Sequence, residues 1–187
     1  MRRQHWEYYL TLTDDIEGLA RYIEPNEKNA NTFSIELVRL LLATGSEIDV
    51  VCKVLCKVGD PNDNATNIDQ YRKQLMAQFP PISQVRITAP KYGLEFTPWN
   101  AWKDDKNPAW WHDYNNVKHE RDSFFEHATL WNALNAAAGL CVMIGYLYRE
   151  WFEKHTVPRP LLFFSDEYKA KGFAMVRSSF KLPMKKC

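Results

Sequence analysis

Hydrophobic residues recur at steps of three and four along much of the chain, a spacing typical of helices with one buried face. The longest such stretch begins near Thr32 or Ser34 and continues to about Val58, and the Ser34 hydroxyl is placed to accept from the first free backbone N–H groups. The whole pattern predicts helices over residues 6–22, 34–58, 67–79, 110–125 and 128–153. The fold is therefore expected to be mainly α-helical.

One stretch between these helices alternates in the manner of a β-strand. Residues 84–88 alternate in polarity, Pro90 to Gly93 has the composition of a turn, and Leu94 to Phe96 is a plausible returning strand. We expect a small hairpin over about residues 84–97, inserted between helices within about 80–98. A two-stranded ribbon is only marginally stable alone, so this hairpin should pack on the helical body.

The length of 187 residues suits one domain with a small appendage. We expect a helical domain over residues 1–157 and a C-terminal arm or tail over 158–187, because the latter has no regular period. The arm should be irregular and held by apolar side chains, namely Leu161, Leu162, Phe163 and Phe164.

The overall composition argues against several classes of protein. There are 24 basic and 23 acidic residues, so no global field favours nucleic acid or an anionic membrane, and such a partner would need a local basic patch. The longest near-apolar run, Ala136 to Tyr148, is short of the roughly 20 residues that cross a bilayer. No secretory signal follows the first residues. We therefore expect a cytoplasmic protein without a membrane partner.

The positions of the cysteines and glycines indicate no site for a metal ion or a cofactor. Cys52, Cys56, Cys141 and Cys187 lack the paired spacing of a zinc site, and we expect reduced, structural thiols. Gly-rich phosphate loops and nucleophile elbows are also missing from the sequence. No cofactor and no metal are therefore expected.

Three of the five histidines fall between Trp110 and His127, which is the stretch richest in reactive side chains. If one helix continues through it, Arg121 shares the apolar side with Tyr114 and Val117. A buried guanidinium needs an acidic partner. Glu47 stands on an apolar face of the second helix, so we expect a structural ion pair between Glu47 and Arg121. A purely structural role for this pair, fixing the register of two helices, is the simpler interpretation.

The run Tyr114-Asn115-Asn116-Val117-Lys118-His119-Glu120-Arg121, with Trp110-Trp111 before it, resembles HEPN-type proteins of prokaryotic defence and toxin–antitoxin systems. More narrowly it is similar to an uncharacterised group with the pattern Tyr-Asn-x-Val-Lys-His-x-Arg. The resemblance covers roughly Trp6 to Phe152. It implies a HEPN-like helical bundle that dimerises, and a metal-independent ribonuclease that uses an Arg followed after four to six residues by a His.

The Arg and His of that motif can be aligned with this chain in two registers. Arg121 and His127 have five residues between them, which satisfies the spacing. The other register matches Asn115 and His119 but places Tyr114 where the family has Arg. The resemblance thus implies catalytic roles for His119, Arg121, Asn115 and His127, with the Arg stabilising charge on phosphate and a His transferring protons.

The flanking residues of the motif are candidates for substrate binding. Lys118 is a candidate phosphate contact, whereas Tyr114 and Trp111 are candidate contacts to the substrate. The alternative for the tryptophans is packing in the core or in a dimer interface. A metal site of His112, His119 and Asp122 is disfavoured, because the two histidines lie two helical turns apart.

Two functions follow as expectations. The first is a HEPN-like protein that binds RNA and cleaves it, as a homodimer, with a cognate antitoxin or other defence protein as partner. The second is a non-catalytic HEPN-like dimerisation or binding module that recognises a protein or a nucleotide. The second predicts that Asn115, His119 and Arg121 are buried and bonded to one another, whereas an open groove carrying them favours the first.

Overall fold

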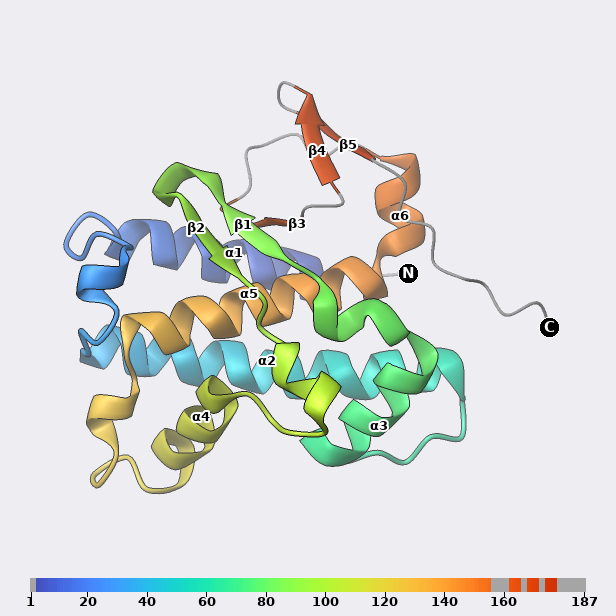
Figure 1. Cartoon of the computed structure of the whole chain (residues 1–187), viewed down its shortest axis with the longest axis horizontal. Helices are drawn as coiled ribbons and strands as arrows, with labels where there is room; N and C mark the ends of the chain where they lie inside the picture. The colour runs from blue at the N-terminus through green and yellow to red at the C-terminus, as the bar shows by residue number, and fades with distance from the viewer. Residues whose placement is uncertain (1–2, 156–161, 166–167, 172–173, 178–187) are drawn as a thin grey trace.

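The protein is mainly helical, as the hydrophobic pattern predicts. The computed structural model describes residues 3–155, 162–165, 168–171 and 174–177. Its helices are α1 (Gln4–Leu19), α2 (Ile35–Gly59), α3 (Ile68–Gln78), α4 (Ala109–His119), α5 (Leu130–Leu147) and α6 (Arg149–Lys154). Helices α2 and α5 lie side by side along the centre, and α1, α3 and α4 pack around them (Figure 1).

The predicted hairpin is confirmed. Strand β1 (Ile87–Ala89) pairs antiparallel with β2 (Leu94–Phe96), and Thr88 lies opposite Glu95. The connection is a 3-10 turn, η3 (Pro90–Tyr92), closed by Gly93 at φ 64°, a left-handed conformation that glycine adopts without strain. On its other edge β1 pairs with β3 (Phe164–Ser165), so a segment from the C-terminal arm completes a three-stranded sheet.

The C-terminal arm contains further short strands. β4 (Tyr168–Lys171) and β5 (Ala174–Arg177) pair antiparallel with each other. Of the apolar side chains expected to hold the arm, Leu162 and Phe163 are buried, and the Phe163 ring lies 6.0 Å from that of Phe96. The side chains of Leu161 and Phe164, and the expected domain boundary at residue 157, lie outside what the structure describes.

The ends of the helices follow local chemistry. Ser34 accepts a hydrogen bond from the N–H of Leu37 at 3.2 Å, as expected for the cap of α2. Asn67 likewise accepts from the N–H of Gln70 at the start of α3. These bonds satisfy N–H groups that have no partner within the helix.

Helix α5 is largely buried. By length and composition it is apolar enough to cross a membrane, but 67% of it is buried in this fold, where it packs against α1, α2 and α4. Its small residues permit close packing: a Cβ at Gly139 would stand 3.2 Å from the Trp110 ring, and Trp99 Nε1 donates to the Gly139 carbonyl at 3.1 Å. This helix is therefore the core of the bundle.

The last predicted helix, 128–153, is wrong in its continuity, because it breaks at Tyr148. Tyr148 leaves helical geometry (φ −107°, ψ 19°) and its side chain is buried. Burial raises the pKa of its hydroxyl, while hydrogen bonds from the backbone N–H groups of His5 and Trp6 oppose that rise. Tyr148 thereby meets the first turn of α1, where N–H groups lack partners within the helix.

Candidate functional site

Helix α4 carries the motif but ends earlier than predicted. It begins after Pro108 and ends at His119, and Glu120 (φ −138°, ψ 51°) leaves helical geometry. A turn follows, and then the 3-10 turn η5 (Phe125–His127). The predicted continuation to residue 125 is wrong, since Asp122 and Ser123 are poor helix formers whose side chains compete for backbone groups.

This early end overturns the expected ion pair between Glu47 and Arg121. Arg121 stands in the turn after α4 and is exposed, so it does not share a side of the helix with Tyr114. Glu47 Oε1 instead lies 2.6 Å from Nδ1 of His5, and both side chains are nearly buried, at 12% and 11% exposed. The acid on the apolar face of α2 does have a buried partner, but that partner comes from α1.

Three of the predicted residues do gather at one surface hollow. Lys118, His119 and Arg121 line an open pocket of about 650 Å³. The other lining residues are Leu42, Val117, Asp122 and Phe125. Two permanent cations and one imidazole face a single acid there, and Lys118, His119 and Arg121 are all exposed. This arrangement is a local basic patch in a chain whose net charge is only +1.

Tyr114 and Trp111, the expected substrate contacts, are packed in the core. They are 2% and 5% exposed, and their ring centroids lie 5.0 Å apart. Tyr114 packs against Gly45, where an added Cβ would stand 2.4 Å from the ring. Lys118, which lines the pocket, has its Nζ 5.5 Å from the centre of the Tyr114 ring, whereas Tyr114 itself does not line the pocket.

Burial and the neighbouring charges set the pKa of the Tyr114 hydroxyl. Desolvation raises this pKa, and the cation of Lys118 opposes the rise. The phenol therefore stays protonated at neutral pH, which excludes it as a base.

Asn115 is turned toward its own helix. Its Nδ2 donates to the carbonyl of Trp111 at 2.9 Å. The expectation that Asn115, His119 and Arg121 are buried together is wrong, because His119 and Arg121 are exposed.

His127 lies in a hydrogen-bonded cluster on the same connection between α4 and α5. Its Nδ1 is 2.7 Å from Oδ1 of Asp113, and Oδ2 of Asp113 accepts from Nδ2 of Asn132 at 2.7 Å. Asn132 Nδ2 also lies 2.8 Å from the backbone oxygen of His127. The carboxylate thus fixes one ring nitrogen, and the imidazole, 33% exposed, is left with Nε2 for another partner.

The sequence reasoning missed Asp113 and Asn132 as members of this cluster. They stand 14 and five residues from His127, and no helical spacing relates all three positions. Thr129 caps α5, because its side chain accepts from the N–H of Asn132. A histidine, an acid and an amide within twenty residues were the only signal in the sequence.

The described residues contain no group of side chains arranged to hold a metal ion. Within the described ranges, no three His, Cys, Asp or Glu side chains are grouped closely enough to hold an ion. Cys52 and Cys56 are buried, and burial raises the pKa of the Cys56 thiol to about 12. Cys187 lies outside the described residues.

No protein-family model, curated protein or solved structure matches this chain.

Proposed function

We propose that this chain binds RNA at the pocket of Lys118, His119 and Arg121 and cleaves it as a metal-independent endoribonuclease of HEPN-like type. The observation that carries the proposal is the presence of two cations and an imidazole around one solvent-open pocket. RNA presents phosphodiesters that Lys and Arg side chains bind. A protein with a net charge of only +1 requires such a local patch for that purpose.

The proposed reaction uses only these side chains and the substrate. A neutral imidazole removes the proton of a ribose 2′-hydroxyl, and the 2′-oxygen attacks the adjacent phosphorus. The bond from phosphorus to the 5′-oxygen breaks, and that oxygen takes a proton from an imidazolium. The products are a 2′,3′-cyclic phosphate and a free 5′-hydroxyl. Lys118 and Arg121 offset the charge that develops on the phosphoryl oxygens.

His119 is the proton-transfer group that the pocket itself supplies. His127 is the second imidazole, and Asp113 is its positioning residue, because a carboxylate on Nδ1 fixes the tautomer and leaves Nε2 available. Phe125 lines the pocket that contains His119, and it lies two residues before His127 in η5.

The direct test is cleavage of a fluorescently labelled RNA by purified protein in excess EDTA. We expect cyclic-phosphate ends, together with a loss of at least about 100-fold in rate for His119→Ala, in line with the usual contribution of acid–base groups. His112→Ala is the matched control, because His112 is exposed on the same helix but does not line the pocket. The catalytic proposal fails if His119→Ala cleaves as fast as the unmodified protein, or if neither cleaves.

A specific observation also favours a second function, that of a non-catalytic HEPN-like dimerisation or binding module. Phe33 and Ile35 are 49% and 67% exposed, and the Phe33 ring packs edge to face on Phe125 at 5.9 Å. Phe33 thus lies beside the pocket, and the two exposed apolar side chains suit a second copy of the chain or a cognate partner protein. Light scattering of the purified protein and of Phe33→Ser tests for the dimer. A dimer that binds RNA without cleaving it would favour this second function.

A further inference from the structure

The proposed RNA pocket has an apolar lining beside its charged side chains. This lining comes from three elements, namely Leu42 of α2, Val117 of α4 and Phe125 of η5. Val117 is buried, whereas Leu42 and Phe125 are half-buried and keep part of their surface uncovered. Phosphate groups gain nothing from such side chains, whereas a nucleobase can bury apolar surface against them. The lining therefore suits more of a nucleotide than its phosphate.

The aromatic ring of this lining is held in place by the segment before α2. The Phe33 ring packs edge to face on the Phe125 ring at 5.9 Å. Phe33 is itself fixed, because its backbone forms an antiparallel bridge with Thr129. Next to that bridge, the Thr32 carbonyl accepts from the N–H of Leu130 at 2.8 Å. The Phe125 ring is thus ordered before a ligand arrives, which lowers the entropy lost on binding.

The cations of the pocket leave the Phe125 ring uncovered. Lys118 Nζ lies instead over the Tyr114 ring, 5.5 Å from its centre. Among the residues that the structure describes, no lysine or arginine lies over Phe125. An aromatic ring without a cation on its face can take a flat partner, and the bases of single-stranded nucleic acids stack on such rings.

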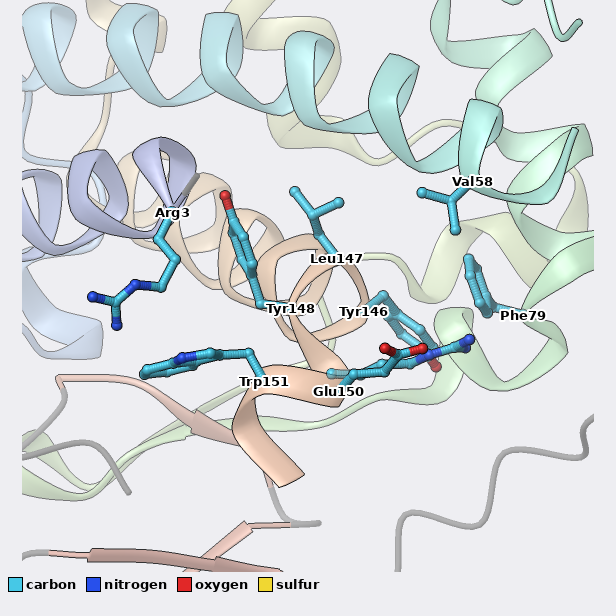
Figure 2. A pocket seen from close by; sticks show the side chains of 9 residues that line it. Arg3, Val58, Phe79, Tyr146, Leu147, Tyr148, Glu150 and Trp151 are labelled. Atoms are coloured by element: carbon cyan, nitrogen blue, oxygen red, sulfur yellow. The ribbon is translucent and has the colours of Figure 1, made fainter. Parts of the chain in front are cut away.

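A second pocket shows the opposite arrangement. It has a volume of about 290 Å³ and lies where α1 begins and α5 meets α6 (Figure 2). The guanidinium carbon of Arg3 lies 4.7 Å from the centre of the Trp151 ring, and that of Arg149 lies 5.8 Å from the centre of the Phe79 ring. Cations thus already lie over these two rings, which stand at opposite ends of the pocket. The pocket at Phe125 is therefore the better site for a base.

We propose that one base of the RNA substrate stacks on Phe125 while the adjoining phosphate lies on Lys118 and Arg121, so that the site takes unpaired RNA. This inference rests on the proposed function and adds its substrate class. In a duplex each base is paired and stacked on its neighbours, so it cannot turn toward a ring in a pocket. The volume of about 650 Å³ is within the roughly 300–1,000 Å³ typical of ligand pockets, which suits one nucleotide. Phe33 is the positioning residue of this contact.

Fluorescence anisotropy with a short labelled 2′-O-methyl RNA of mixed sequence tests the proposal on the full chain. This RNA lacks the 2′-hydroxyl and stays intact, so binding is measured apart from cleavage. We expect the single strand to bind at least about fivefold more tightly than the same strand annealed to its complement, which is the lower end of what one base–aromatic stack contributes. Phe125→Leu should remove this preference by weakening single-strand binding alone. Phe125→Trp should keep it, because an indole still offers a face for stacking.

Two variants separate stacking from other effects. Phe124→Leu is the matched control, because Phe124 is a half-buried neighbour that does not line the pocket, and it should bind both forms like the unmodified protein. Arg121→Ala should weaken binding of both forms alike, since both present phosphates.

The inference is overturned if the duplex binds as tightly as the single strand, or if Phe125→Leu keeps full single-strand affinity in a protein that melts like the unmodified one. If Phe125→Leu does not fold, unchanged single-strand affinity of Phe33→Ala overturns it instead. Each of these results leaves RNA binding by the pocket intact. A protein that binds neither form overturns this inference and the proposed function together.

Discussion

Gly45 provides a sharp test of how α4 is held against α2. A Cβ built at Gly45 would stand 2.4 Å from Cδ2 and Cε2 of the Tyr114 ring and 2.8 Å from its Cγ. The ring is 2% exposed and packs on Trp111, so it has little room to retreat. Overpacking of this kind costs about 1–3 kcal/mol, and contacts this short place the cost at about 2–3 kcal/mol, in the upper part of that range. Alanine in a helix interior regains about 1 kcal/mol over glycine.

We therefore expect Gly45→Ala to lower the free energy of unfolding by about 1–2 kcal/mol net, measured by urea denaturation at constant m-value. Gly18→Ala is the matched control, because no heavy atom lies within 4 Å of a Cβ there, and it should stabilise α1 by about 0.5–1 kcal/mol. A Gly45→Ala protein as stable as the unmodified chain would refute the close packing of Tyr114 on α2.

Three further outcomes are expected. Glu47→Ala should lower the free energy of unfolding by about 1–3 kcal/mol in urea denaturation, because it leaves the buried His5 ring without its acceptor. Asp113→Ala should remove the hydrogen bond that holds the His127 ring in its Nδ1-protonated tautomer. The nitrogen chemical shifts of this imidazole should then change from values typical of that tautomer to values typical of a mixture of both. The Cys56 thiol ionises near pH 9.0 when unfolded but only near about pH 12 when folded, so its contribution to stability falls as pH rises between these values, by about 1.4 kcal/mol per pH unit.

Each of these has an internal control. Glu126→Ala removes an exposed carboxylate and should change stability by less than about 0.5 kcal/mol. In the spectra of Asp113→Ala, the exposed His112 should keep its shifts, and an unmoved His127 would contradict the hydrogen bond. A Cys56→Ala variant should show a shallower loss of stability above pH 9 than the unmodified chain; equal slopes would mean that other groups, such as Tyr71, account for the loss.

Local patterns were sufficient for most of the fold. The Ser34 cap, the span of α2 and the hairpin around Gly93 are confirmed, because each depends on residues within a few positions of one another. The same patterns failed at the ends of α4 and α5. The helical spacing of apolar residues continues in the sequence beyond His119, but the backbone leaves helical geometry at Glu120. Periodicity does not account for polar side chains that compete with the helix for backbone hydrogen bonds.

The sequence by itself determined that this is a mainly helical chain whose reactive side chains concentrate between Trp110 and His127. It also brought Lys118, His119 and Arg121 within four positions, which any local conformation keeps near one another. Only the tertiary structure decided the partners of distant groups: His5 for Glu47, 42 positions away, and Asp113 for His127 across a turn. The physical reason is that periodicity reports which face of an element is buried, whereas pairing between faces depends on how the elements pack.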